Sequence, residues 1–234
     1  MKIFWSWQSD TSQECGRYFV RDVLKYIAKQ LNTVDTLEEA ERSDGYSKVM
    51  VDFDTKDVAG SPHIASTILT KIQSSAVFVA DVTPIGTSAN GKKPIANPNV
   101  MIELGYAIKA LGLERIVLVM NEAEGASLDS LPFDLRHLRA PVSYCLAANP
   151  DRSTTDEAFK KLTADLTARL KPSLAIAATE MRHDRRLSNP QPEFNVTLQA
   201  ATGDLPQKIS QDLSDLASPT IDSIKKKQIG RAHV

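Results

Sequence analysis

The sequence predicts an α/β protein with a flavodoxin-like sheet of five parallel strands, in the order 2-1-3-4-5, and helices on both faces. Short apolar runs alternate along the chain with amphipathic stretches of helical period, which is typical of repeated strand–helix units. The central run AVFVADV (76–82) is almost wholly apolar, as expected of a parallel strand buried on both faces. Right-handed crossovers between such strands favour this order.

The first half of the chain should supply three strands and two helices. The run KIFWSWQ predicts a first strand, and KVMVDFD predicts a second. Between them, a capping box of Thr11 and Glu14 predicts the start of a helix. The next helix should begin at Ser61 and Pro62 and bury Ile64, Ile68, Leu69 and Ile72. The expected order is a strand at 2–8, a helix at 11–32, a strand at 48–54, a helix from 61, and a strand at 76–82.

The second half should supply two more strands and two more helices. We expect the segment TPIGTSANGKKPIA (83–96) to be a loop. Asn97 and Pro98 predict the next helix start, because Asn caps helices and Pro suits the first helical position. A capping box of Thr154 and Glu157 predicts the last helix. The expected order is a helix from 98, a strand at 115–121, a strand at 141–146, and a helix at 154–170.

The chain should divide near residue 171. Residues 1–171 form the predicted domain, and residues 172–234 are interpreted as a linker plus an incomplete C-terminal segment, because this part is mixed in character and broken by proline. The last residues, QIGRAHV, match the translation of a common sequencing adapter. We therefore expect that the gene record was cut short and that the native protein continues into a further domain.

Composition excludes several classes of protein. The net charge of −1 gives no electrostatic footprint for nucleic acid. No apolar run approaches the roughly 20 residues that a membrane span needs. Two cysteines offer no disulfide framework, which fits a reducing cytoplasm, and the four scattered histidines lack metal-ligand spacing. We expect a cytoplasmic protein without a metal or a resident cofactor.

Glu103 has no obvious structural role in its helix. The stretch NPNVMIELGYAIKALG (97–112) places apolar residues on one stripe, and Glu103 lies at the edge of that stripe. No basic residue stands three or four positions away, and Glu103 is past the first turn, where the helix dipole favours an acid. A carboxylate in this position is a candidate for chemistry.

The crevice where the strand order reverses is the expected site. Ligands of open α/β sheets bind there, outside the carboxyl ends of the strands. Polar and aromatic side chains should gather from the ends of strands one to three and from the helix after strand three. These candidates are Ser6, Trp7, Gln8, Phe53, Asp54, Asp81, Asn99 and Glu103.

This set of side chains limits the chemistry. It contains no histidine or cysteine, which excludes hydrolysis by a Ser/His/Asp or Cys/His arrangement. The chain also has no GxxxxGK[ST] loop and no GxGxxG fingerprint after the first strand. A lone carboxylate beside an aromatic ring suits cleavage of an N-glycosidic bond, because its charge stabilises the cation that develops on the ribose. Nicotinamide, already positively charged in that linkage, needs no acid to leave.

Five segments together resemble a bacterial TIR-like (Toll/interleukin-1-receptor-like) domain. They are KIFWSWQSD, VDFDTKDVAGSPHI, AVFVADVTP, NPNVMIELGYA and LPFDLRHLRAPVSY, in this order, and the resemblance covers residues 1–170. It implies an NAD+ glycohydrolase of bacterial antiphage defence, with NAD+ as substrate and Glu103 as the catalytic residue. It also implies that Ser6, Trp7 and Gln8 shape the nucleotide pocket.

The resemblance also implies partners. The segment 54–63 corresponds to the BB loop of the family, which packs against a neighbouring subunit. We therefore expect activation by homo-oligomerisation, triggered by a sensor domain beyond the C-terminus. Gln8 stands where TIR enzymes often carry a basic residue, so a phosphate contact would come from Lys56, Lys92 or Lys93 instead.

Other interpretations of the same residues stay open. The segment NPNVMIELGYA also resembles nucleoside 2-deoxyribosyltransferases, which use a Glu as nucleophile toward deoxyribose. A TIR scaffold that only assembles partners would not depend on Glu103. A phospho-receiver would use Asp81, but no acidic pair follows the first strand directly. Periodicity alone favours Trp7 as a core residue, and its place near the carboxyl end of the strand makes a ligand platform equally open. Asp81, taken alone, favours a turn cap over a ligand contact.

Overall fold

The computed structural model describes residues 1–38, 48–54, 63–91 and 93–188. Residues 1–182 form one compact unit, and the second unit, 183–234, is described only as far as Ser188. Five parallel strands form the main sheet, in the order β2-β1-β3-β6-β7. Their bounds are Lys2–Ser6 for β1, Met50–Asp52 for β2, Val77–Asp81 for β3, Ile116–Asn121 for β6 and Val142–Tyr144 for β7. The predicted α/β class and parallel sheet are confirmed.

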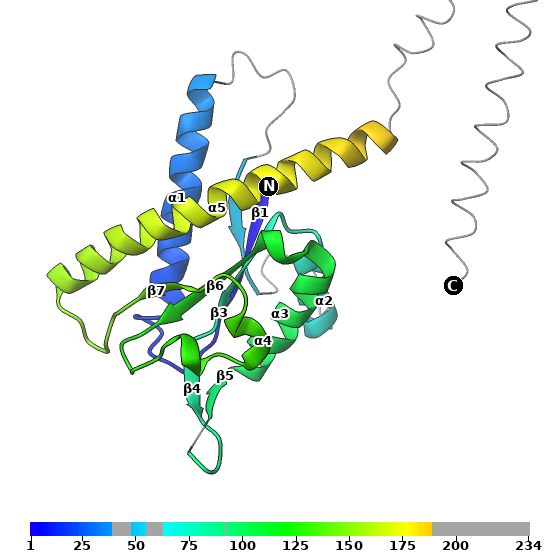
Figure 1. Cartoon of the computed structure of the whole chain (residues 1–234). Helices are drawn as coiled ribbons and strands as arrows, with labels where there is room; N and C mark the ends of the chain where they lie inside the picture. Colours follow the sequence, from blue (N-terminus) through cyan, green and yellow to red (C-terminus); the bar gives the residue numbers. More distant parts are fainter. Residues whose placement is uncertain (39–47, 55–62, 92, 189–234) are drawn as a thin grey trace, which may run out of the picture. The chain divides into compact units, whose positions relative to one another are not determined.

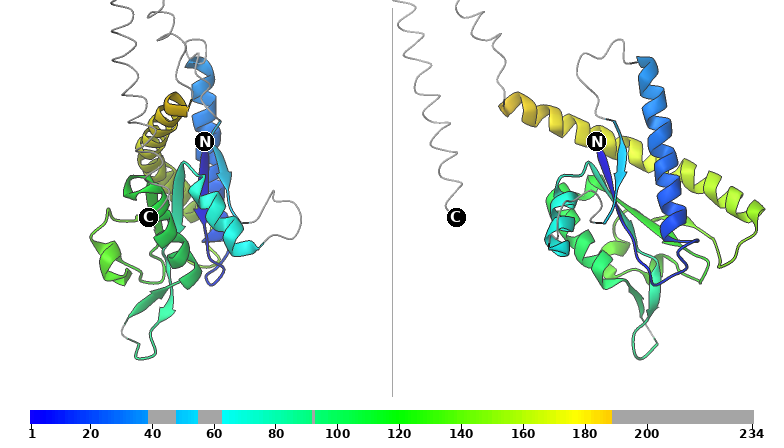
Figure 2. Two further views of the ribbon diagram at one scale, coloured as in Figure 1. Left: turned by 90° about the vertical axis from the view of Figure 1, so that its right-hand side faces the viewer. Right: turned by 180° about the vertical axis from the view of Figure 1, so that it is seen from behind.

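Helices cover both faces of this sheet, and Figures 1 and 2 show the two layers. On one face lie α1 (Arg17–Glu38) and α5 (Arg152–Ser188), and on the other lie α2 (Ile64–Gln73) and α3 (Pro98–Leu111). Short helical segments follow at η2 (Leu113–Arg115), η3 (Leu128–Ser130) and α4 (Phe133–Arg136). The helices of the described residues are all too short or too polar to cross a lipid bilayer.

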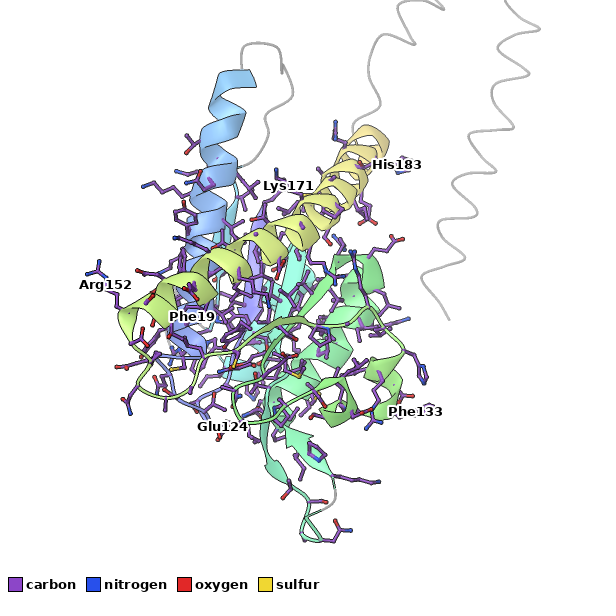
Figure 3. All side chains as sticks on the ribbon, turned by 60° about the vertical axis from the view of Figure 1, so that its left-hand side comes forward. Phe19, Glu124, Phe133, Arg152, Lys171 and His183 are labelled. Carbon is purple, nitrogen blue, oxygen red and sulfur yellow. The ribbon has the colours of Figure 1, made fainter. Side chains whose placement is uncertain are left out.

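Alternation along the strands divides the core into two clusters, because successive side chains of a strand point to opposite faces. In β1, Ile3 and Trp5 pack with α1 and α5, whereas Phe4 packs with α2 and α3. Phe4 stacks on Phe78 of the neighbouring β3, with ring centroids 5.9 Å apart. Phe19, labelled in Figure 3, belongs to the first cluster and lies edge-on to Phe159 of α5. Both faces of the central strands are therefore buried, which explains their apolar sequence.

The start of α1 differs from the sequence prediction. The capping box of Thr11 and Glu14 does not begin the helix, which starts at Arg17 after a turn closed by a hydrogen bond from Gly16 N to Ser12 O of 2.9 Å. Tertiary contacts account for the delay. Cys15 Sγ donates to Ala147 O at 3.0 Å, and the Cys15 carbonyl accepts from the Tyr144 hydroxyl at 2.8 Å. These long-range bonds hold the segment against the β7 loop.

The expected loop at 83–96 contains an antiparallel hairpin, formed by β4 (Pro84–Thr87) and β5 (Pro94–Ala96). Figure 1 shows it projecting from the carboxyl edge of the sheet. The observed strand order differs from the expected 2-1-3-4-5 because this hairpin takes the fourth and fifth places along the chain without joining the sheet. Each strand is short and begins with proline, and there is a register shift between Pro84 and Gly86, so no alternating pattern announces it.

The ends of α2 and α5 also differ from expectation. His63 caps α2, and Ile64 is exposed instead of buried, while Ser61 and Pro62 lie outside the described residues. The cap of α5 is Asp151, whose carboxylate accepts from Thr154 N at 2.8 Å and from Thr154 Oγ1 at 2.8 Å, and the helix begins at Arg152. The prediction that a capping box of Thr154 and Glu157 begins this helix is therefore wrong.

The last helix continues where a linker was expected. α5 passes through Pro172 and ends at Ser188, whereas the sequence predicted an irregular segment from residue 172. A proline inside a helix costs about 3 kcal/mol. Leu174 and Ala177 are buried in the core cluster, and Ser173 Oγ donates to Glu114 O at 2.8 Å. These contacts offset the cost, and the segment after 171 begins as part of the folded unit.

Candidate functional site

A cavity of about 190 Å³ lies at the carboxyl end of β1, bordered by the end of β2 and the first turns of α3. Six of the sequence-predicted site residues line it. They are Ser6, Trp7, Gln8, Asp54, Asn99 and Glu103. Phe4, Trp5, Ser9, Ile68 and Asn97 complete the wall. The cavity therefore unites residues from four separate parts of the chain at the edge where the sheet topology predicts a ligand.

Two features of α3 hold Glu103 in place: the cap at the start of the helix and the buried face of the helix. The Asn97 side chain accepts hydrogen bonds from Asn99 N at 2.9 Å and from Val100 N at 3.2 Å, and Pro98 occupies the first turn as predicted. Val100, Leu104, Ala107 and Leu111 are buried against the sheet. Because this stripe fixes the rotation of the helix, Glu103 is directed along its edge, over the end of β1.

Glu103 has a specific partner. Ser6 Oγ donates to Glu103 Oε2 at 2.5 Å, and Ser6 is itself buried as the last residue of β1. Burial of the carboxyl group raises the pKa of Glu103, the Ser6 hydrogen bond opposes that rise, and the charge of Asp54 adds to it. A poorly solvated carboxylate acts strongly on a nearby positive charge, because little water screens it.

Asp54 adds a second carboxylate to the same wall. Its backbone adopts φ 57°, in the left-handed region that Asp tolerates better than most residues. Asp54 follows β2 by two residues and lines the cavity. Residues 55–62, which include most of the segment expected to form an oligomer contact, lie outside the described residues.

Two predicted site residues lie elsewhere. Phe53 packs against the core cluster of α1 and α5, with Lys25 Nζ 5.8 Å from its ring centroid. Asp81 is buried, and its Oδ1 accepts from Thr83 N at 3.0 Å, as a turn cap does. Burial raises the pKa of Asp81 to about 6, against the hydrogen bonds of Thr83 and Gln8 that lower it. Neither Phe53 nor Asp81 is among the residues that line the cavity.

A second cavity, of about 590 Å³, lies beside the first, under the hairpin. Its wall comes from residues 10–15, from the hairpin and from the segments after β6 and β7. It holds two carboxylates, Asp10 and Glu124, and Glu124 is labelled in Figure 3. Two hydrogen bonds separate the cavities: Asn97 Nδ2 donates to Asp10 Oδ2 at 2.5 Å, and Gln8 Nε2 donates to Thr83 O at 3.4 Å. Asn97 and Gln8 line the smaller cavity, and their partners Asp10 and Thr83 line the larger one.

Sequence reasoning missed several contributors to the site. Asn97 was recognised as a helix cap, but its place in the cavity wall and its bond to Asp10 depend on a contact between distant segments. Arg17 was not considered, although its guanidinium lies over the Trp7 ring. No sequence signal pointed to Arg17, because the helix was expected to begin at residue 11, and only the structure places Arg17 at the helix start, where the dipole disfavours a basic residue.

The described residues contain no group of three or more His, Cys, Asp or Glu side chains arranged to hold a metal ion. Among the described residues that line the Glu103 cavity there is no His and no Cys, so these residues form no Ser/His or Cys/His pair. Carboxylates, a hydroxyl, amides and an indole can stabilise a cation and orient a sugar. Searches with protein-family models and among curated proteins find no match to this chain.

Proposed function

We propose that this chain is a TIR-like NAD+ glycohydrolase in which Glu103 stabilises the ribosyl cation. The observation that carries the proposal is the half-buried Glu103 carboxylate, hydrogen-bonded to the buried Ser6 in a cavity that also presents Trp7 and Gln8. The sheet supports the same assignment. With the hairpin left out of the count, its strand order is 2-1-3-4-5, which is the flavodoxin-like order.

In the proposed reaction, the bond between the nicotinamide nitrogen and ribose C1′ breaks, and nicotinamide leaves as a neutral molecule with the bonding electrons. The positive charge passes to the ribose, where Glu103 stabilises it. Water then attacks C1′ and releases a proton, giving ADP-ribose. Attack by the adenine of the same substrate would give a cyclic ADP-ribose. Ser6 keeps Glu103 in position, and Trp7 and Gln8 help to seat the nucleotide.

The wider role follows from the resemblance to bacterial TIR-like domains. We propose that the domain is a cytoplasmic antiviral effector that becomes active when subunits assemble through the 54–63 loop. The resemblance implies that a sensor domain would trigger this assembly. Turnover per subunit should therefore rise with protein concentration, and a rate per subunit independent of concentration would contradict this requirement.

The test compares two carboxylates of the same chain. Concentrated protein is incubated with NAD+, with and without a crowding agent, and nicotinamide release is followed by chromatography. Glu103→Gln keeps the size of the side chain and removes its charge, and it should lower release by about a thousandfold or more. The matched control, Glu124→Gln, alters the exposed carboxylate of the larger cavity and should leave release within about twofold of wild type.

Two results would overturn the proposal. Equal release from wild type and Glu103→Gln would remove Glu103 from the reaction. No release, even from a forced oligomer, would favour a TIR scaffold. A second candidate, nucleobase exchange on deoxynucleosides, is favoured by the size of the Glu103 cavity, which is below the roughly 300 Å³ at which drug-sized ligands are accommodated. Transfer of deoxyribose from a deoxynucleoside to a free base would identify that activity.

A further inference from the structure

The described wall of the Glu103 cavity offers a dinucleotide no positive charge. Among the described residues that line it are two carboxylates, Glu103 and Asp54, and no Lys or Arg. A dinucleotide carries a diphosphate with two negative charges, which such a wall repels. Lys56 and Lys92, two of the expected phosphate contacts, lie outside the described residues, and Lys93 is exposed on the hairpin, which lines the other cavity. The cavity therefore needs a cation at its rim if it binds a substrate of this class.

Arg17 is next to the cavity, with the ring of Trp7 between them. It is the first residue of α1, and its guanidinium carbon is 3.3 Å from the centroid of the Trp7 ring. Trp7 in turn lines the cavity. A guanidinium stacked on an aromatic face keeps its N–H donors around its edge, where they remain able to bind a phosphate. The stacking thus fixes a cation close to Trp7 without using its donors.

No carboxylate neutralises Arg17 in the part of the chain that the structure describes. Two other arginines there make ion pairs: Arg21 with Asp22 at 2.8 Å, and Arg115 with Glu180 at 3.4 Å. Arg17 is half-buried and makes no ion pair or hydrogen bond with the described residues. Its place at the start of a helix is also electrostatically unfavourable, because the helix dipole is positive there. A half-buried cation in this setting suits an anion that arrives from outside.

We propose that Arg17, held on Trp7, binds the diphosphate of the dinucleotide substrate and sets the preference of the site for dinucleotides over nucleosides. This inference rests on the proposed function, since it names the residue that recognises the charged part of NAD+. The phosphate contact is thereby assigned to Arg17 of α1 instead of to the lysines expected from the sequence. The ring of Trp7 then has two neighbours, the nucleotide cavity and the Arg17 guanidinium.

The test measures a specificity ratio, using the full chain. NAD+ and nicotinamide riboside share the scissile bond, but only NAD+ has the diphosphate. Arg17→Gln should lower the ratio of kcat/KM for NAD+ to kcat/KM for nicotinamide riboside by about tenfold or more. Arg17→Lys, which keeps the charge and loses the planar fork, should give an intermediate ratio. Arg21→Gln is the matched control, one helical turn along and ion-paired with Asp22, and it should keep the wild-type ratio.

The outcomes separate this inference from the proposed function. A ratio that Arg17→Gln and Arg21→Gln leave equally unchanged overturns the role of Arg17 and leaves the glycohydrolase standing. If wild type releases no nicotinamide from either substrate, the proposed function fails, and titration calorimetry with inorganic pyrophosphate decides the anion site. Binding to wild type and to Arg21→Gln but not to Arg17→Gln supports the site. Absent or equal binding overturns it.

Discussion

The two cavities at the carboxyl edge of the sheet share a wall but differ in size and in the placement of their carboxylates. The larger one, of about 590 Å³, holds the exposed Asp10 and Glu124. The smaller one, of about 190 Å³, holds Glu103, which is partly withdrawn from water and bonded to the buried Ser6. Solvent screens an exposed carboxylate, whereas a half-buried carboxylate is screened less and acts more strongly on a nearby charge. The burial of the Glu103 carboxylate, rather than the volume of its cavity, identifies the smaller cavity as the candidate reaction site.

The elements that build each cavity explain the difference. The smaller cavity is formed where β1 ends against α3, so Ser6 and Glu103 are both fixed by regular elements whose other faces are buried. The larger cavity is formed mainly by connecting segments and by the hairpin, which supply small and polar residues. Sites on packed helices and strands hold side chains more firmly than sites on loops. This contrast can be tested by changing one cavity at a time.

After the loss of the Glu103 charge, the largest effect is expected from filling each cavity in turn. Asn99 is exposed in the first turn of α3 and lines the smaller cavity, and Asn99→Trp should lower nicotinamide release by about a hundredfold by displacing the substrate. Thr87, exposed on β4, lines the larger cavity, and Thr87→Trp should change release by less than about twofold. Circular dichroism melting would confirm that both variants fold. The reverse pattern of activities would move the reaction to the larger cavity.

The next largest effect concerns Asp81, which is buried near both cavities and lines neither. Because burial raises its pKa from 3.8 to about 6, the folded chain keeps the proton at pH values where the unfolded chain has lost it. Stability should therefore fall as pH rises from about 4 to about 6, by about 3 kcal/mol in all. Asp81→Asn should remove this slope and stabilise the chain at pH 8 by about 1–3 kcal/mol in urea unfolding.

The neighbours of Asp81 support that expectation. Asp81 Oδ2 and Gln8 Oε1 are both buried without a hydrogen-bond partner among the described residues. The amide of an Asn at position 81 is neutral and has N–H donors, which the carboxylate lacks. Unchanged pH dependence in the variant would show that another group titrates in this range. A lower stability at pH 8 would contradict the assignment of Asp81 as an unfavourable buried charge.

The smallest expected effect is a shift in the pH dependence of the reaction. Release requires ionised Glu103, so kcat/KM should fall as pH drops through its raised pKa. Ser6→Ala removes the hydrogen bond that lowers this pKa, and the acid limb should move to higher pH. Asp54→Asn removes the charge that raises it, and the limb should move to lower pH. Shifts of the acid limb in the same direction in both variants would contradict this account of Glu103.

The sequence predicted much of the candidate site because its signals are local. The cap at Asn97, the proline after it and the apolar stripe of α3 are readable within one helix, and they place Glu103 at the edge of the buried face. The alternation along β1 and the end of that strand likewise place Ser6, Trp7 and Gln8 at the carboxyl edge. Six of the eight predicted residues line one cavity for these reasons.

The errors arose where distant segments compete with local preference. Thr11 and Glu14 match the capping-box pattern, but Cys15 is hydrogen-bonded to the segment after β7, and α1 starts later. Pro172 is a strong local breaker, but packing of Leu174 and Ala177 carries the helix through it. In both cases a tertiary contact outweighs a local propensity of about 1–3 kcal/mol.

The sequence by itself determined the α/β class, the parallel sheet and the position of Glu103 on its helix, because periodicity and caps act over a few residues. Only the tertiary structure decided that Ser6 bonds to Glu103, that Asn97 and Asp10 divide two cavities, and that Arg17 stacks on Trp7. These contacts join segments far apart in the chain or depend on rotamers. They form only when the sheet and both helix layers have packed, which no local pattern encodes.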